Sequence, residues 1–247
     1  MKYSCDVKVN RDNSFSMEKW KDVPTKYWPV YAWFWASTIE KDEIDRQLKV
    51  MYDNDIRAVY VISMPKNFRP SVMPTFLEPE YLSEEYFERY AYMVECATKL
   101  GMDVYLYDEG GWPSGSACGR VVAKHPEFLR MKIEKEEKTS PYLPSDTAIT
   151  AFSGGKRILP GEVCEEQITE YRLAPVYSLT APPFPNVSAK GATECFIELT
   201  HEEYKRHLGE DVFGKHITVA FTDETGTYEH AWTDELAAEF EARYGYD

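Results

Sequence analysis

The stretch MDVYLYDEGGWPSGSACGR, residues 102–120, decides the fold that we predict. Its first residues form an apolar and aromatic run, which is typical of a buried strand. The run ends abruptly in Asp108 and Glu109, and two glycines, Trp112 and further small residues follow. The sequence therefore predicts a strand with two carboxylates at its carboxyl end and a loop behind them.

A second stretch repeats the first half of this pattern. Residues 216–226, HITVAFTDETG, form another apolar run that ends in an acidic pair, Asp223 and Glu224. We therefore expect two strands of the same kind, near 102–108 and 217–223.

Strand and helix patterns alternate along most of the chain. Apolar runs near 30–36 and 58–64 predict two more buried strands. This alternation predicts one parallel sheet, with the strands in chain order and right-handed crossovers. Amphipathic spacing, capping residues and terminal glycines predict the helices, at 38–54, 83–101, 114–124, 188–208 and 233–245.

Two segments fall outside this alternation. Residues 1–27 are polar and predict an irregular N-terminal segment. Residues 128–187 contain short alternating patterns between turn residues, which predict a small antiparallel β insertion on the carboxyl-end rim of the sheet. The predicted fold class is α/β, of the (β/α)₈ TIM-barrel type, with about the first four βα units supplied by residues 28–247.

Alternation along the strands predicts which side chains enter the barrel mouth. One face of each barrel strand packs on the helices and the other faces inward. In the first acidic strand the aliphatic side chains share a face with Asp108, so Tyr107 and Glu109 are expected to point inward. In the second they share a face with Asp223, so Glu224 is expected to point inward.

Inward carboxylates at the carboxyl end of barrel strands occupy the usual position of an active site. Such a carboxylate can exchange protons when burial raises its pKa, and it can accept hydrogen bonds from sugar hydroxyls. Paired acids flanking a bond are the chemistry of glycoside hydrolysis, and aromatic rings stack on sugars. The candidate catalytic residues are Glu224 and Glu109, and the candidate sugar-binding residues are Asp108, Trp112, Tyr107, Trp35, Trp33 and Asp223.

Structural interpretations compete with these roles. An Asp at a strand end often caps the next turn, which is the first interpretation of Asp108 and Asp223. The equivalent positions of the two glutamates favour a function for them. His201, His207 and His216 match no zinc-site spacing and are expected as surface or hydrogen-bonded residues rather than as metal ligands.

Composition limits the partners. The net charge is −14, from 42 acidic and 28 basic residues, which argues against nucleic acid and anionic membranes. No run approaches the ~20 apolar residues of a membrane-spanning helix, and the N-terminus lacks the apolar core of a signal peptide. The five cysteines form no C-x-x-C pair. They are expected as free thiols in a reducing compartment, which favours a soluble, cytoplasmic protein.

Three long segments, 33–64, 80–120 and 199–224, carry a family resemblance, and YDEGGWPSG and FTDE are its most specific parts. These segments resemble the catalytic barrel of α-L-rhamnosidase-like glycoside hydrolases, family 106 and its uncharacterised relatives. The resemblance implies a carbohydrate substrate cleaved at the barrel mouth, with glutamates as acid and base. It also implies a calcium ion near the sugar in some members.

The sequence departs from this family pattern in two residues and in length. Ala36 stands where the family has an asparagine, and Thr225 stands where it has a proline. Only four βα units are recognisable in a chain of 247 residues, whereas such a barrel has eight. We therefore expect the remainder of the barrel to come from a longer parent chain. We also expect this chain alone to aggregate or oligomerise through its open strand edges.

Three functional hypotheses follow. The first is a glycoside hydrolase, possibly acting on α-L-rhamnosides, that is incomplete as given. The alternative is a non-catalytic carbohydrate-binding half barrel or an inactive relative. The third, a barrel enzyme in which Glu224 abstracts a proton beside a metal, is weaker because few further Asp or His ligands are available.

Overall fold

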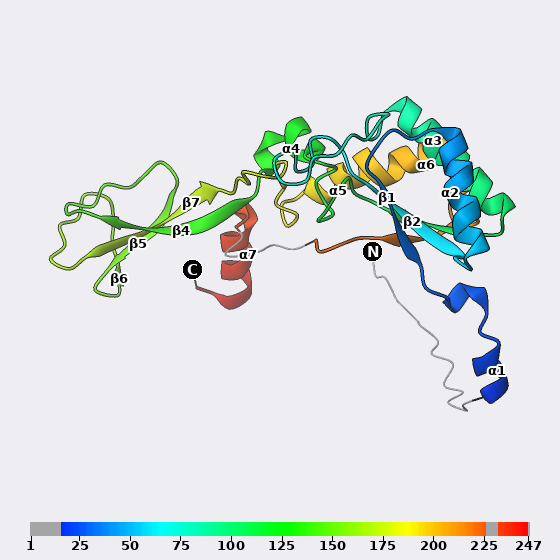
Figure 1. Cartoon of the computed structure of the whole chain (residues 1–247). Helices are drawn as coiled ribbons and strands as arrows, with labels where there is room; N and C mark the ends of the chain where they lie inside the picture. Colours follow the sequence, from blue (N-terminus) through cyan, green and yellow to red (C-terminus); the bar gives the residue numbers. More distant parts are fainter. Residues whose placement is uncertain (1–15, 226–231, 247) are drawn as a thin grey trace.

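The computed structural model of the chain describes residues 16–225 and 232–246 (Figure 1). A short helix, α1 (Met17–Lys21), and a 3₁₀ turn, η1 (Thr25–Tyr27), precede the sheet. The described part of the N-terminal segment thus contains helical turns where an irregular chain was expected. Residues 1–15 of that segment lie outside the described residues.

Four parallel strands form the central sheet in the order β1-β2-β3-β8. They are β1 (Tyr31–Trp35), β2 (Ala58–Ser63), β3 (Asp103–Tyr107) and β8 (Ile217–Phe221). The four predicted strands, their order and their parallel direction are confirmed. Within the described residues the sheet is open, because β1 and β8 each pair with a strand on one side only.

Helices cover one face of this sheet (Figure 1). The main ones are α2 (Lys41–Asp53) and α3 (Glu84–Lys99), which lie close to their predicted bounds. The predicted helix 188–208 is instead divided into three parts, and the helix predicted at 114–124 begins only at Arg120. The remaining helical elements are α4 (Arg120–Lys124), η2 (Pro126–Phe128), α5 (Ala192–Ile197), the π-helical turn η3 (Glu198–Glu202), α6 (Glu203–Leu208) and α7 (Asp234–Tyr244).

The main core lies between the sheet and these helices. Trp35 of β1 is 2% exposed and packs edge-on against Tyr86 and Tyr90 of α3. The Tyr86 hydroxyl lies 2.7 Å from the Ser63 hydroxyl and 2.8 Å from that of Tyr204 in α6. This buried chain of hydroxyl groups fixes α3 and α6 on the end of β2, because a buried polar group needs a hydrogen-bond partner.

The opposite face of the sheet is apolar and partly open. Phe34 and Phe221 point to it and are 54% and 40% exposed. Tyr60 joins them, with its ring 5.4 Å from that of Phe221 and 6.2 Å from that of Tyr107. Several large apolar side chains thus share this face of the sheet and remain partly exposed.

The segment after η2 forms a second, antiparallel sheet in the order β4-β7-β5-β6. This confirms the predicted β insertion within 128–187. Its buried Glu170 accepts hydrogen bonds from the Tyr142 hydroxyl at 2.8 Å and the Ser145 backbone N–H at 3.0 Å. The strands are β4 (Met131–Lys138), β5 (Ala148–Ser153), β6 (Lys156–Arg157) and β7 (Ile168–Pro175).

The segment that follows β7 and contains Pro182 and Val187 packs beside the loop that follows β3. A Cβ built on Gly119 would lie 2.8 Å from Pro182, and one on Gly115 would lie 3.2 Å from Val187. The insertion is therefore attached at the carboxyl ends of the sheet strands, on the predicted rim.

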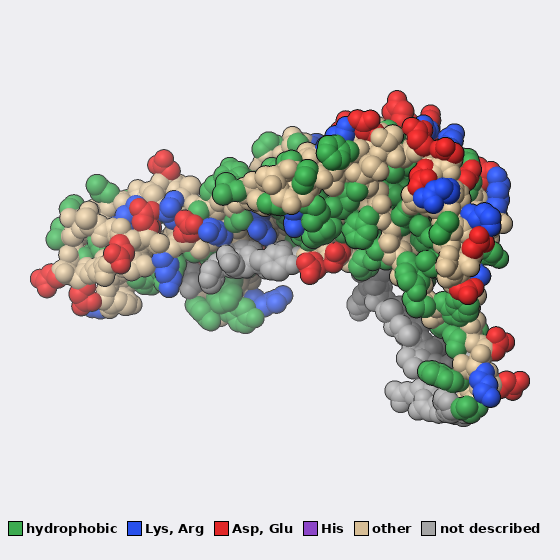
Figure 2. All heavy atoms as spheres, viewed as in Figure 1, with side chains coloured by type: hydrophobic (Ala, Val, Ile, Leu, Met, Phe, Trp, Pro, Cys, Tyr) green, Lys and Arg blue, Asp and Glu red, His purple; other side chains and the backbone are tan. Residues whose placement is uncertain are grey.

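Acidic side chains gather over α2 and α3 (Figure 2), whose first turns are acidic. In the described part of the chain, no helix has the length and apolar character needed to cross a membrane. Four cysteines, Cys96, Cys118, Cys164 and Cys195, are free. Cys5 lies outside the described residues.

Candidate functional site

The carboxyl ends of β3 and β8 meet in one hydrogen-bond network. The Ser114 hydroxyl donates to Asp108 Oδ1 at 2.6 Å and accepts from the Asp223 backbone N–H at 2.9 Å. The Ser114 backbone N–H donates to the Asp223 carbonyl at 2.8 Å. The Thr222 hydroxyl donates to Asp108 Oδ2 at 2.5 Å. Neighbouring parallel strands thus bring both predicted acidic pairs to one edge of the sheet.

Glu109 organises the loop that follows β3. Its carboxylate is 1% exposed and accepts five backbone N–H groups at distances of 2.5–3.0 Å. Burial raises the pKa of Glu109 to about 7, and the backbone donors act in the opposite direction. Both carboxylate oxygens are engaged, so this geometry favours a loop-holding role over the catalytic role that the sequence suggested.

The loop can fold around Glu109 because two glycines follow it. A Cβ on Gly111 would lie 2.2 Å from the ring of Phe68, and Gly111 has a φ of +83°. Its backbone N–H donates to the Ser63 carbonyl at 2.7 Å, and its carbonyl accepts from the Tyr107 hydroxyl at 2.8 Å. Only a residue without a side chain allows this approach between the loop and β2.

Trp112 and Tyr107 lie near these strand ends. Trp112 is half-buried, with its ring 5.0 Å from that of Phe68 and 5.3 Å from the Arg69 guanidinium. Tyr107 points to the inward face, as predicted, but the loop buries it. Its burial and the nearby carboxylate of Asp223 raise the Tyr107 pKa.

Trp33 and Trp35 pack against the helices and not beside the hydrogen-bond network at the ends of β3 and β8. This corrects their expected position among the sugar-binding residues. The Trp33 indole N–H donates to Gln47 of α2 at 2.7 Å, and Trp35 packs against α3. The register explains the difference, because Trp33 pairs with Val61 and so shares the helix-facing side of the sheet. Their uniformly apolar run gave no alternation from which to assign a face.

A β-bulge in β8 alters the predicted alternation at Glu224. Val104 pairs with Ile217, but Leu106 pairs with Ala220, so β8 has one residue more than β3 over this interval. After the bulge Phe221 shares the inward face with Tyr107, where continuous alternation predicted Phe221 on the helix side. The argument that pointed Glu224 inward therefore does not hold.

Glu224 and Asp223 are nevertheless the acids that solvent can reach. Glu224 is exposed and has a φ of +46°, which takes the chain out of the strand direction. Asp223 is partly exposed, whereas Asp108 is 0% exposed.

His201 also lies in this region, although the sequence gave it no role in the site. Its Nε2 lies 3.6 Å from Asp108 Oδ2, and its side chain is 26% exposed. The π-helical turn η3 contains His201, and such turns often occur at functional sites. No sequence pattern signals this turn, so the contact could not be predicted.

The calcium ion implied by the family resemblance does not fit the described residues. They contain no group of three or more His, Cys, Asp and Glu side chains that could hold a metal. Calcium needs about six to eight oxygen ligands, and the carboxylates of Asp108 and Glu109 are already engaged by hydrogen-bond donors.

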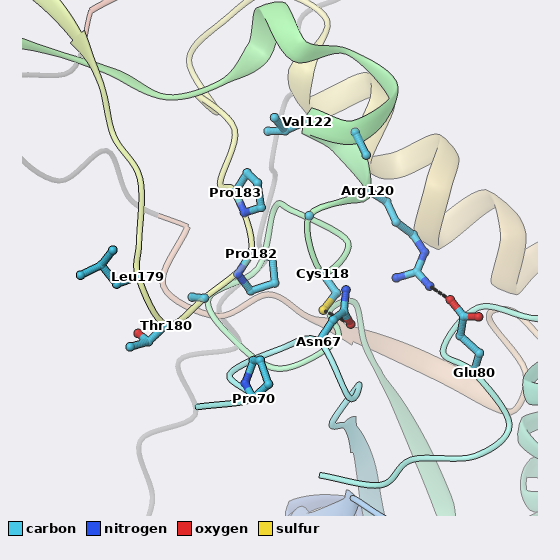
Figure 3. A pocket seen from close by; sticks show the side chains of 13 residues that line it. Asn67, Pro70, Glu80, Cys118, Arg120, Val122, Leu179, Thr180, Pro182 and Pro183 are labelled. Carbon is cyan, nitrogen blue, oxygen red and sulfur yellow. Dashed lines mark hydrogen bonds and ion pairs between the residues drawn. The ribbon is translucent and has the colours of Figure 1, made fainter. Parts of the chain in front are cut away.

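Another cavity lies beside the loop that follows β3, and Asn67, Cys118 and Pro182 are among the residues that line it (Figure 3). It measures about 630 Å³ and contains none of the predicted site residues. Arg120 at its rim is paired with Glu80 at 3.1 Å. Cys118 also lines it, but burial raises the pKa of this thiol to about 12, which removes its nucleophilic form at neutral pH.

Comparisons with known proteins add little to this geometry. No family model and no curated protein matches the chain. Similar solved structures include a rhamnosidase from Novosphingobium sp. PP1Y, with 18% identity and a TM-score of 0.35 over 57% of this chain and 12% of the rhamnosidase chain. They also include a trehalose-6-phosphate hydrolase from Bacillus licheniformis, with 15% identity and a TM-score of 0.39 over 72% of this chain and 33% of that one.

The chain thus spans a third or less of the length of either solved structure. The chain is a mixed α/β protein with a parallel sheet.

Proposed function

We propose that this chain is part of a glycoside hydrolase barrel that binds a carbohydrate at the carboxyl ends of β3 and β8. The observation that carries the proposal is the meeting of two Asp-Glu strand ends in one network, with Asp223 and Glu224 accessible to solvent. Accessible carboxylates at this end of parallel strands match the location and chemistry of glycosidase sites.

The open sheet supports the barrel part of this proposal. Within the described residues no further strand pairs with the outer edge of β1 or β8, and Phe34 and Phe221 are exposed on the inward face. Further parallel strands, supplied by a longer parent chain, would pair both edges and bury this face.

In this proposal Glu224 donates the proton to the leaving-group oxygen, and Asp223 and Trp112 position the sugar. Asp108 and Glu109 hold the loop and the strand ends in place, because their oxygens are already bonded to protein donors. Trp112 offers a partly exposed ring for stacking. The preferred substrate is an O-glycoside, and an α-L-rhamnoside is the first to try.

The test compares the hydrolysis rates of the Glu224→Gln variant and of the unsubstituted protein on aryl and alkyl glycosides, including rhamnosides. Loss of a general acid costs ~10²–10⁴-fold in rate when the leaving group needs protonation. We expect this loss on alkyl glycosides and a much smaller one on activated aryl glycosides. Glu210→Gln, at an exposed residue paired with Lys205, is the matched control. Equal rates for Glu224→Gln and the parent on both substrate types would exclude the acid role.

A second candidate, a carbohydrate-binding module without catalysis, is favoured by one observation. Backbone N–H groups of the loop donate to both oxygens of the Glu109 carboxylate, so Glu109 does not supply the second catalytic acid that hydrolysis needs. Binding of sugars measured by calorimetry, with no turnover of any aryl glycoside, would select this candidate.

A further inference from the structure

Arg69 lies beside the ring that the proposed function places against the sugar. Its guanidinium carbon is 5.3 Å from the centre of the Trp112 ring and 4.8 Å from that of the Phe68 ring. The two rings lie 5.0 Å apart and are inclined by 63° to each other. Arg69 follows β2 and Trp112 follows β3, so the contact lies where the loops behind two neighbouring strands meet at the carboxyl edge of the sheet.

The charge of Arg69 is not compensated by the surrounding protein. In the part of the chain that the structure describes, no carboxylate forms an ion pair with Arg69, and its Nε is buried without a hydrogen-bond partner. The nearby acids of the loop after β2 are engaged elsewhere, because Glu78 pairs with Lys66 and Glu80 pairs with Arg120. Aromatic rings lie against the guanidinium, but they supply no oxygen that could accept its hydrogen bonds.

The terminal nitrogens of Arg69, Nη1 and Nη2, are the groups that a ligand can reach. Arg69 is partly exposed, and Nε is its only nitrogen that is both buried and without a partner among the described residues. Nη1 and Nη2 also have no protein acceptor, so they must be open to solvent. Two rings hold the guanidinium, and such a planar fork binds a carboxylate or a phosphate through two parallel hydrogen bonds.

The overall charge of the protein makes this contact selective. The net charge is −14, and the accessible acids of the proposed site, Asp223 and Glu224, are negative as well. Long-range electrostatics therefore oppose the approach of an anionic ligand. An acidic sugar can bind more tightly than its neutral parent only where a specific cation meets it.

We propose that the sugar bound beside Trp112 is acidic, and that its carboxylate or phosphate accepts hydrogen bonds from Nη1 and Nη2 of Arg69. This inference rests on the proposed carbohydrate function and specifies its substrate class. Arg69 selects acidic over neutral sugars and takes no part in the proton transfer assigned to Glu224. The contact uses only the solvent-accessible nitrogens and does not require access to the buried Nε.

The test is a calorimetric titration of the 247-residue protein at neutral pH with two uronates and their neutral parents. The pairs are glucuronate with glucose, and galacturonate with galactose. Glucose 6-phosphate is the third acidic probe and distinguishes a phosphate from a carboxylate. At least one acidic sugar is expected to bind ~10-fold tighter or more than its neutral parent, because hydrogen bonds to charged groups exceed neutral ones by about that factor.

A matched pair of variants localises the effect. Arg69→Gln removes the charge, so the affinity for the acidic sugar should fall to that of its neutral parent, while the affinity for the neutral sugar is retained. Arg46→Gln removes the same charge from an exposed residue of α2 that pairs with Glu43. That control should keep the preference for the acidic sugar. Arg69→Lys keeps the charge without the planar fork and should keep only part of the preference.

A direct readout on the unsubstituted protein does not depend on the folding of any variant. The ¹⁵N NMR signal of the Arg69 Nε–H group should shift when the acidic sugar is added and not when its neutral parent is added. A guanidinium that only packs against Phe68 and Trp112 would show no such difference between the two sugars.

Two results would overturn the inference and leave the proposed function standing. Neutral sugars that bind as tightly as all three acidic ones would remove the acidic substrate class. A preference for the acidic sugar that survives in Arg69→Gln would assign the anion to another cation. If neither acidic nor neutral sugars bind, the proposed function fails, and the inference fails with it.

Discussion

The same dipeptide, Asp-Glu, ends β3 and β8, yet its two copies lie in opposite environments. Asp108 and Glu109 are 0% and 1% exposed and bonded on all carboxylate oxygens, whereas Asp223 is partly exposed and Glu224 is exposed. The following residues make the difference. A glycine-rich loop folds back over Glu109 after β3, and a left-handed residue turns the chain away after β8. An acidic strand end therefore acquires its role from the chain behind it.

The largest expected effect separates the two glutamates by stability. Glu109→Leu removes the acceptor for five buried backbone N–H groups, and each unsatisfied group costs ~1–3 kcal/mol. The free energy of unfolding should fall by ~3 kcal/mol or more. Glu224→Leu, at an exposed position, should change it by less than ~0.5 kcal/mol. Urea denaturation of both variants measures the contrast, and similar losses would show that exposure does not distinguish the two strand ends.

The pH dependence of stability sharpens the same contrast. Burial raises the pKa of Glu109 from 4.5 to about 7, so the folded state binds a proton more tightly than the unfolded state. The contribution is then fully present below about pH 4.5 and is lost as the pH rises through about 7. A loss on the order of 3 kcal/mol is expected over this window.

The measurement is urea denaturation at several pH values, together with a ¹³C NMR titration of the Glu109 carboxyl group. A stability that increases between pH 4.5 and 7, with a Glu109 titration below 4.5, would mean that the five backbone donors outweigh burial.

A smaller effect is expected where the two strand ends are joined. Ser114→Ala leaves Asp108 Oδ1 without its 2.6 Å donor and the Asp223 N–H without its acceptor. The loss should be ~2 kcal/mol, because both groups stay partly or fully buried. Ser178→Ala, in an exposed turn, is the control and should be nearly neutral. A neutral Ser114→Ala would show that water replaces the hydroxyl and that the strand ends are held by other contacts.

The sequence predicted the βα framework because its signals are local. Apolar runs, capping residues and terminal glycines identify strands and helices without knowledge of their neighbours, and the strands near 30–36 and 217–223 illustrate this. The convergence of the acidic pairs followed from parallel topology. The face of the sheet to which Glu224 points could not be predicted. A one-residue bulge in β8 inverts the alternation of side chains, and no sequence pattern signals this bulge.

The contact between His201 and Asp108 and the burial of Glu109 depend on distant segments for the same reason. The π-helical turn η3 begins 91 residues after the end of β3, and tertiary packing brings His201 to Asp108. The five donors to Glu109 come from residues 110–118, whose loop conformation depends on contacts with Phe68 and Ser63. Local patterns contain neither set of contacts.

The smallest expected effect concerns the aromatic ring beside the strand ends. Trp112 is half-buried against Phe68 and Arg69, so Trp112→Ala should lower the free energy of unfolding by only ~1 kcal/mol. If the ring stacks on a bound sugar, the same variant should weaken binding ~5-fold, with little change in turnover at saturating substrate. Trp28→Ala is the control, because Trp28 lies before β1 and donates to the Val23 carbonyl, away from the strand ends. Sugar affinity from calorimetry should be unchanged in Trp28→Ala. Equal affinities for both variants and the parent protein would exclude Trp112 from the sugar site, and would leave Asp223 and Glu224 as the accessible groups that could hold the substrate.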